Sequence, residues 1–267
     1  MSKKGATNGV PVAKKVCSLP VPVVVEPDVV ETDAKLTNVF ELLAKSPDDL
    51  IVIDNFLPQH TAENALQAIQ NVPQASWHVA TNSPQDYSAA VHHYLVGDGS
   101  IGAEYNDDIE NVLSTVGSTA LPDADQDMVR LQLGRYESGD GIAPHDDIAV
   151  QELDFAPTSN RQPVTATRRI ALIYYLTKDW TEDMGGAFVD MNEVDQNHSR
   201  QKKQKWTAHV PRFNRVVAFN VPRLHSVEPV AAVKRPRYSV FGWLYEELPG
   251  KGKGKGRAKK NKKNKFY

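Results

Sequence analysis

The chain contains 267 residues, of which 40% are hydrophobic and 24% are charged, and its formal net charge is -2. It is long enough to bury one large core, and β-rich domains often reach this length as one domain. No stretch approaches the roughly 20 apolar residues of a membrane span, and no apolar signal region follows the N-terminus. We therefore expect a soluble intracellular domain, cytoplasmic or nuclear, with no membrane contact.

Charge is distributed unevenly along the chain. Residues 250–267 contain nine Lys or Arg and no acidic residue, so the remainder of the chain carries a net charge of -11. Such a run buries too little apolar area to offset its chain entropy, and we expect residues 249–267 to be a disordered tail. The tail is either an electrostatic arm for RNA, the ribosome or nuclear import, or a solubilising segment.

The N-terminal part shows helical signals after an irregular start. Residues 1–35 follow no regular period and are predicted to be disordered. Order is expected to begin at Leu36, because residues 36, 39, 40 and 43 are apolar at helical spacing. Residues 50–57 are typical of a buried strand and turn, and helices are predicted at residues 62–72, ended by Pro73, and at 107–116.

From residue 128 onward the pattern becomes that of strands. Alternating apolar residues and β-rich runs predict strands near residues 129–133, 168–177, 186–191, 216–220 and 237–245. Turn-rich segments separate them, as in a sandwich or barrel. We expect an α+β domain over residues 36–248, with supporting N-terminal helices and a double-stranded β-helix, or jelly roll, as its core.

One motif carries most of the functional information. His145 and Asp147 are separated by one residue, and His225 follows at a distance. Two imidazoles and one carboxylate form the facial triad that binds Fe(II) and leaves positions open for other ligands. Side chains at i and i+2 of a strand share a face, so a strand would turn His145 and Asp147 inward and Asp146 outward. The only cysteine, Cys17, has no partner within the chain, so any metal must use imidazole and carboxylate.

An anion site is predicted on two later strands. Arg237 and Ser239 share one face of the last strand, where a guanidinium and a hydroxyl can hold one carboxylate. Tyr175, on the strand before it, can add a phenol. Each signal is weak alone, because His-x-Asp arises by chance and a lone His is more often structural. Their order along the chain strengthens the prediction.

These residues resemble a known family. The segments that carry the likeness are Pro144–Asp147, Arg168–Ala171, Tyr174–Trp180, Met184–Gly186, His225–Val227 and Arg237–Trp243. Together they resemble the 2-oxoglutarate/Fe(II) oxygenases, and among them the catalytic domain of the ribosomal-protein prolyl hydroxylases. The Tyr174–Trp180 run also resembles the hypoxia-factor prolyl hydroxylases. The resemblance covers about residues 50–246.

The resemblance implies roles for individual residues. It assigns Fe(II) to His145, Asp147 and His225 as catalytic metal ligands. It assigns 2-oxoglutarate to Arg237, assisted by Tyr175 and Ser239, with Tyr136 near this cosubstrate. O2 would be the second cosubstrate, and an L-ascorbate (vitamin C) requirement is expected by resemblance alone. Trp180 and Trp243 are interpreted as packing residues.

Two departures limit the substrate prediction. The ribosomal-protein hydroxylases carry a second, non-catalytic jelly-roll domain, which we do not expect here. Residues 148–167 form a long, polar, Pro-containing segment beside the motif, either closing over a peptide or forming a tolerated surface insertion.

The leading hypothesis is a dioxygenase that hydroxylates a protein, with a prolyl residue as the favoured target, and releases succinate and CO2. An oxygenase acting on another residue or on a small molecule is the first alternative. A non-catalytic jelly-roll module that docks on RNA or the ribosome through its basic tail is the second.

Overall fold

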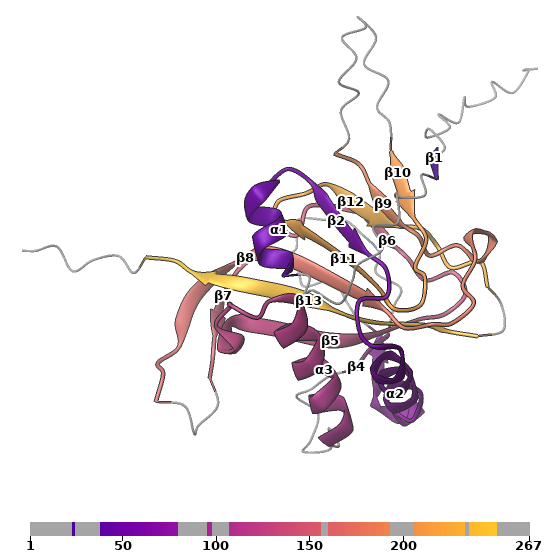
Figure 1. Ribbon diagram of the computed structural model, residues 1–267, viewed down its shortest axis with the longest axis horizontal. Coiled ribbons are helices and arrows are strands. Elements are labelled where there is room, and N and C mark those ends of the chain that lie inside the picture. Colours follow the sequence, from indigo (N-terminus) through magenta and orange to yellow (C-terminus); the bar gives the residue numbers. More distant parts are fainter. Residues whose placement is uncertain are drawn as a thin grey trace, which may run out of the picture.

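The computed structural model describes residues 23–24, 38–79, 95–97, 107–155, 160–192, 206–232 and 235–249. The predicted disordered N-terminus and Lys-rich tail lie almost entirely outside these ranges. Within residues 1–35 only β1 (Val23–Val24) is described, and it pairs in parallel with β10 (Thr207–His209). The described part combines a few helices with two mostly antiparallel sheets, which confirms the predicted α+β jelly-roll class (Figure 1).

Three α-helices correspond to the predicted helical segments. They are α1 (Val39–Lys45), α2 (Gln59–Gln70) and α3 (Asp107–Ala120), accompanied by short 3-10 turns at Gln74–Ser76, Gln126–Met128 and Glu182–Met184. Asn38 caps α1, because its side-chain oxygen accepts hydrogen bonds from the N–H groups of Phe40 and Glu41. As predicted, α2 ends before Pro73, which cannot continue a helix. None of the described helices is long and apolar enough to cross a membrane.

The larger sheet has eight strands and carries most of the predicted ones. Seven of them follow the order β2 (Leu50–Ile53), β11 (Arg215–Asn220), β8 (Val164–Tyr175), β13 (Arg237–Glu247), β5 (Val129–Tyr136), β4 (Leu95–Gly97) and β3 (Trp77–Val79). β7 (Val150–Leu153) pairs with the first four residues of β8, Val164–Thr167. The described part of residues 148–167 therefore includes a pair of hydrogen-bonded strands and is not only a loop.

The smaller sheet provides the opposite layer. Its strand order is β1, β10, β9 (Phe188–Asp190), β12 (His225–Val227) and β6 (Ile142–His145). β12 and β6 are far apart in the chain and hydrogen-bonded neighbours in the sheet. β9 lies within the strand predicted at residues 186–191. The other strands of this sheet were not individually predicted, because two to four residues show too little alternation to stand out.

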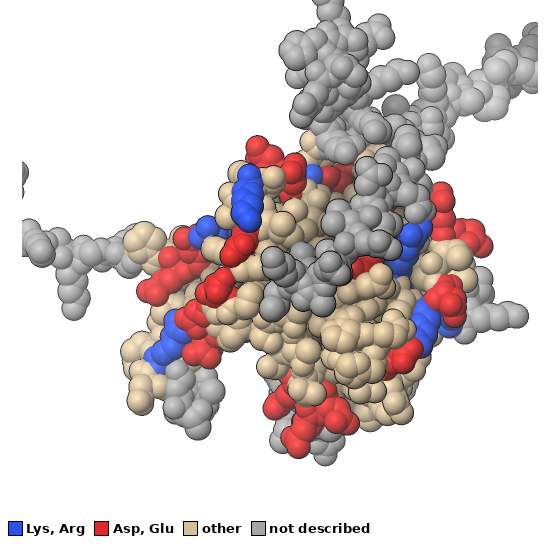
Figure 2. Space-filling view, viewed as in Figure 1, with Lys and Arg blue, Asp and Glu red and all other residues tan. Residues whose placement is uncertain are grey.

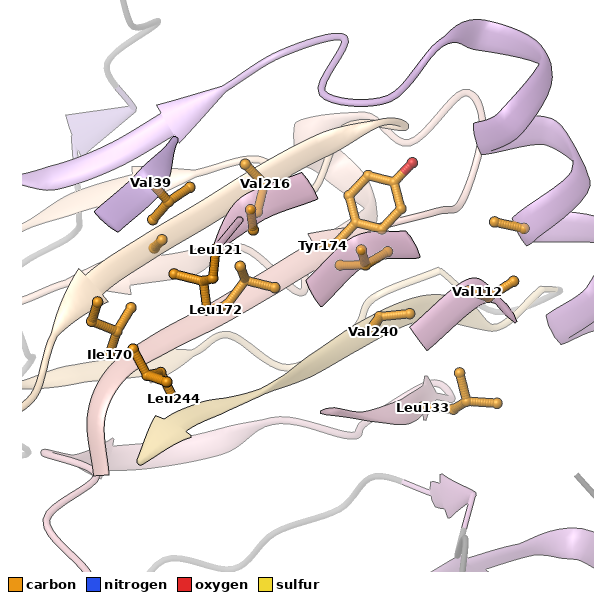
Figure 3. Packing of buried hydrophobic residues seen from close by; sticks show 14 of the residues in the cluster. Val39, Val112, Leu121, Leu133, Ile170, Leu172, Tyr174, Val216, Val240 and Leu244 are labelled. Carbon is orange, nitrogen blue, oxygen red and sulfur yellow. The ribbon is translucent and has the colours of Figure 1, made fainter. Parts of the chain in front are cut away.

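The core lies between the larger sheet and the helices. On β8, Ile170, Leu172 and Tyr174 belong to this core and pack with residues of α1, α3 and β13 (Figure 3). The alternate residues Ala171 and Tyr175 face the smaller sheet, where they join a separate cluster with Phe188 and Phe219. β8 is therefore buried on both faces, which explains its near-continuous apolar sequence.

Acidic side chains are spread over the described surface. Figure 2 shows them gathered at the lower end of α3, whose first turn contains Asp107, Asp108 and Glu110. Negative side chains in the first turn of a helix are favourable beside its partial positive charge. The acidic residues at the start of α3 are therefore explained by their stabilising effect on the helix.

Candidate active site

The predicted site residues line one cavity between the two sheets. The cavity has a volume of about 570 Å³. β6 and β12 of the smaller sheet form one wall, and β5, β8 and β13 of the larger sheet form the other. All seven residues predicted for the site, Tyr136, His145, Asp147, Tyr175, His225, Arg237 and Ser239, contribute to its lining.

His145, Asp147 and His225 form a compact group of possible metal ligands. His145 ends β6 and His225 begins β12, and the two residues are direct cross-strand partners. Asp147 Oδ1 lies 3.5 Å from His145 Nε2, and its Oδ2 lies 3.6 Å from His225 Nε2. One ligand atom from each residue falls within 4.8 Å of the others, and no further His, Cys, Asp or Glu of the described residues joins this group.

A turn, and not the strand pleat, brings Asp147 to the two histidines. β6 ends at His145, and Asp147 has a φ of 65°. The Asp146 carboxylate accepts a hydrogen bond from the Ile148 N–H at 3.1 Å, which closes an Asx turn. The prediction that both ligands lie on one strand was therefore wrong, although Asp146 is exposed as expected. Asp tolerates the left-handed conformation better than most residues, which suits it to this position.

Backbone carbonyls fix the orientation of both imidazoles. His145 Nδ1 lies 2.9 Å from the Ala143 carbonyl oxygen, and His225 Nδ1 lies 2.7 Å from that of Arg223. A carbonyl oxygen can only accept, so each Nδ1 carries the proton and each Nε2 presents its lone pair. This is the usual outer-shell arrangement of metal-binding histidines.

For Asp147 and His225 the electrostatics favour the protonation states of metal ligands at neutral pH. Burial lowers the pKa of His225 to about 4, although the Asp147 charge opposes this shift. Burial alone would raise the pKa of Asp147, but its hydrogen bond to His145 and the charges of His225, His145 and Arg168 outweigh burial and lower it to about 2. His225 is therefore neutral and Asp147 ionised. For His145, burial acts to lower the pKa but Asp147 outweighs it, so the pKa is raised.

The residues fit a divalent metal ion. Metal bonds to imidazole and carboxylate are about 2.0–2.2 Å long, so two ligands of one ion lie at most roughly 4.4 Å apart. The measured separations of 3.5 and 3.6 Å satisfy this condition. Two imidazoles and one carboxylate with the rest of the cavity open are typical of non-haem Fe(II) oxygenases.

The opposite wall presents buried donors for an anion. Arg237 and Tyr175 are each 1% exposed, and neither Arg237 Nε nor Tyr175 Oη has a hydrogen-bond partner among the described residues. Burial raises the pKa of Tyr175, against the effect of the nearby Arg237 and Arg215 charges, so its phenol remains a donor at neutral pH. Buried donors without partners are costly, which indicates that a ligand satisfies them.

The same wall also contains a stacked Arg237 side chain and a Ser239 hydroxyl that fits beside Gly134. The guanidinium carbon of Arg237 lies 3.8 Å from the ring centre of Tyr136, and Nη1 donates to the Gly186 carbonyl. Ser239 is opposite Gly134 on β5, where an added Cβ would lie 2.8 Å from Ser239 Oγ. Gly134 therefore provides the room that Ser239 occupies. A carboxylate held here would meet a fixed cation and hydroxyl donors, which fits a dicarboxylic acid that reaches the metal with its other end.

Two cavity residues were missed or given another role. Trp243 was interpreted as core packing, but it also lines the cavity. Arg168 stacks on its ring at 3.6 Å and lies 3.6 Å from the Asp147 carboxylate. Residues 237, 239, 241 and 243 of β13 all line the cavity, so the strand period starting from Arg237 could have placed Trp243 there. Trp180 is structural as predicted, because its Nε1 donates to the Gly185 carbonyl at 2.9 Å.

Comparisons with known proteins agree with this geometry. Residues 131–245 match the sequence profile of the 2OG-Fe(II) oxygenase superfamily. The fold is similar to a Pseudomonas putida prolyl-4-hydroxylase, with 16% identity and a TM-score of 0.51 over 78% of this chain and 100% of that chain. It is also similar to a prolyl hydroxylase from Trichoplax adhaerens in complex with a hypoxia inducible factor oxygen degradation domain peptide fragment, with 19% identity and a TM-score of 0.50 over 78% and 88% of the two chains.

At these identities the two structures support the fold alone, and no protein of curated function matches the chain in sequence. The profile match, however, contains every residue of the metal group and of the anion-binding wall. Residues 131–245, which contain both groups, are thus the part of the chain that is similar in sequence to the 2OG-Fe(II) oxygenase superfamily.

Proposed function

We propose that the protein is an Fe(II)- and 2-oxoglutarate-dependent dioxygenase that hydroxylates a protein substrate, with a prolyl residue as the favoured target. The observation that carries the proposal is the pairing, within one cavity, of a two-histidine, one-carboxylate group with unpartnered buried donors on the facing wall. A metal site alone would not need Arg237, and an anion site alone would not need the three ligands.

The residues divide into two sets. His145, Asp147 and His225 would hold the iron, and Arg237 with Tyr175 and Ser239 would hold the distal carboxylate of 2-oxoglutarate. When bound, iron, 2-oxoglutarate and O2 together supply the oxidant, with succinate and CO2 as the products of the cosubstrate. The protein contributes binding, orientation and exclusion of water.

Two buried aromatic rings pack against His225 on the side that faces away from the cavity. The Phe188 ring stacks on the His225 ring with centroids 5.1 Å apart, and the Phe219 ring lies 4.8 Å away. Both phenylalanines are fully buried. These contacts restrict the His225 ring and keep water from its buried face. The open side of the ligand group faces the cavity instead.

Exposed apolar residues near the opening of the cavity are an argument for a polypeptide substrate. The three exposed large hydrophobic residues of the described chain are Ile148, Val150 and Leu224. Ile148 and Leu224 line the cavity, and Val150 begins β7. Apolar residues gathered at one opening are typical of a binding surface. We propose that the β7–β8 hairpin forms one wall of a channel for an extended chain.

A prolyl residue suits this channel chemically. Its ring is apolar and its nitrogen carries no N–H in a peptide, so it can enter beside Ile142, Leu224 and Trp243 without leaving a donor unpaired. The edge of β7 that pairs with no strand among the described residues can pair with the flanking backbone of an extended substrate. Arg168, between Trp243 and Asp147, offers donors to a substrate carbonyl.

Mass spectrometry of candidate peptides tests the proposal. Peptides with and without proline would be incubated with Fe(II), 2-oxoglutarate and either the wild type or Asp147→Ala. We expect one added oxygen on a prolyl residue, coupled to succinate formation, with the wild type alone. Oxygen added to another residue or to a small molecule would contradict the prolyl assignment. Absence of 2-oxoglutarate turnover in well-folded protein with every substrate would favour a non-catalytic binding module.

Other predictions can be tested with the same preparation. Likeness to the ribosomal-protein hydroxylases predicts ribosomal proteins as the first substrates to test. Omitting ascorbate tests the expected requirement for it. Contact of residues 250–267 with RNA or the ribosome, and a cytoplasmic or nuclear location, stay predictions from the sequence.

A further inference from the structure

A buried ion pair lies directly beside one of the candidate metal ligands. Asp190 on β9 is the cross-strand partner of His225 on β12, so the two side chains project from the same face of the smaller sheet. They are 2% and 3% exposed. A buried carboxylate is stable only when it is paired and hydrogen-bonded. Arg223 supplies both, because its Nε donates to Asp190 Oδ1 at 2.9 Å and its Nη2 donates to Oδ2.

The same arginine is connected to the imidazole of His225. The backbone carbonyl of Arg223 accepts the hydrogen bond from His225 Nδ1 at 2.7 Å. Its side chain is fixed a second time, because Nη1 donates to the Asp48 carbonyl at 2.7 Å, in the turn before β2. A short covalent path therefore joins the ion pair to the carbonyl that orients the metal ligand.

Neighbouring backbone groups tighten the same connection. The Met191 N–H donates to the Leu224 carbonyl at 3.0 Å, and the Leu224 N–H donates to Asn192 Oδ1 at 3.1 Å. The Asn192 N–H in turn donates to Asp190 Oδ1 at 3.1 Å. The residue before His225 and the residues after Asp190 are thus held together by hydrogen bonds that converge on one carboxylate.

We propose that Asp190 and Arg223 are positioning residues for the metal site. They hold the Arg223 carbonyl against His225 Nδ1, which fixes the tautomer and the direction of the Nε2 lone pair. The inference rests on the proposed function of His225 as a metal ligand.

The effect should be seen in metal binding itself. Removing an outer-shell partner of a metal-binding histidine typically lowers metal affinity by about 10- to 100-fold. In Asp190→Asn the amide nitrogen would face the donors of Arg223 and leave its charge without a partner. We expect Mn(II) to bind this variant about 10- to 100-fold more weakly. Arg223→Lys keeps the charge but loses the fork, so we expect a loss of about 10-fold.

The chain offers a control for the loss of a two-point Arg–Asp ion pair. Arg215 donates through Nε and Nη2 to the two oxygens of Asp54 at 2.6 and 2.7 Å. The Arg215 side chain is 2% exposed and the Asp54 side chain is 21% exposed, so this pair is partly buried. Neither residue contacts the metal ligands in a described interaction. Asp54→Asn should therefore lower the melting temperature and leave Mn(II) affinity unchanged.

Two measurements on the full chain test the proposal. Free Mn(II) would be counted by electron paramagnetic resonance during titration, and the visible spectrum of the Co(II) form would report coordination geometry. We expect weaker Mn(II) binding and an altered Co(II) spectrum in Asp190→Asn and Arg223→Lys, but not in Asp54→Asn. If Asp190→Asn does not fold, Arg223→Lys alone decides.

Wild-type Mn(II) affinity and an unchanged Co(II) spectrum in the folded variants, with lower melting temperatures only, would overturn the positioning assignment. Failure of the wild type to bind Mn(II) or Co(II) would instead overturn the metal site, and with it the proposed function. The two failures are therefore distinguishable.

Discussion

Replacing Arg237 by Lys tests the anion-binding wall while keeping its positive charge. Arg237 is 1% exposed, stacks 3.8 Å from the Tyr136 ring centre and donates through Nη1 to the Gly186 carbonyl. Its Nε has no hydrogen-bond partner among the described residues. The planar guanidinium can thus bind Gly186 and a carboxylate at the same time. A Lys ammonium lacks this fixed fork, so one of these interactions is weakened.

The expected loss follows from the number of hydrogen bonds. A hydrogen bond between charged groups contributes about 1.5–3 kcal/mol. Losing one such bond to 2-oxoglutarate corresponds to about 10- to 150-fold weaker binding, because roughly 1.4 kcal/mol is a factor of ten. His145, Asp147 and His225 are untouched, so Mn(II) affinity should not change.

An anaerobic titration measures this effect. The Fe(II) protein would be titrated with 2-oxoglutarate, and the visible charge-transfer band of the chelate gives the dissociation constant. The control is Arg169→Lys on β8 of the same sheet, because the Arg169 side chain is 45% exposed and pairs with Glu246 at 3.1 Å. Unchanged 2-oxoglutarate affinity in Arg237→Lys, or an equal loss of metal binding, would refute the assignment of Arg237 to the distal carboxylate.

Three further predictions concern space, charge and the tail. Gly134→Ala should weaken 2-oxoglutarate binding and lower the unfolding free energy by about 1–3 kcal/mol in urea titrations, because the new Cβ would lie 2.8 Å from Ser239 Oγ. If Gly134→Ala keeps the wild-type unfolding free energy and 2-oxoglutarate affinity, the claim that residue 134 has no room for a Cβ is wrong. Burial and repulsion from Glu182 raise the pKa of Glu228, so its protonated form is favoured in the folded state and stability falls as pH rises from the unfolded pKa through the folded one. Glu228→Gln should therefore raise the melting temperature at pH 7, and this gain should shrink toward pH 4. A gain that is the same at both pH values would show that the Glu228 charge is not its cause. Removing residues 250–267 should leave 2-oxoglutarate turnover unchanged, and an inactive product would place the tail within the domain.

Local sequence patterns predicted most of the larger elements. Pro73 and the apolar spacing before it predicted α2, and the β-rich run around Ile170 predicted β8, because helix and strand periods are properties of neighbouring residues. The short strands β6, β10 and β12 carry little periodicity, and pairing with distant partners defines them. The hairpin arm of β7 escaped prediction for the same reason.

By itself the sequence identified the residues that we propose supply the chemistry. His145, Asp147, His225 and Arg237 were identified by type, spacing and order, and all four line the same cavity. How they are held was decided by the tertiary structure. The left-handed turn at Asp147 depends on a local hydrogen bond that the spacing does not reveal.

Long-range contacts decided the rest of the site. Trp243 reaches the cavity and Arg168 stacks on it because β8 and β13 are neighbours in the larger sheet. Asp190 lies beside His225 only because β9 pairs with β12, and Arg223 then joins the two. The identity of the proposed metal ligands thus follows from residue types along the chain, whereas their orientation depends on partners that only folding brings together.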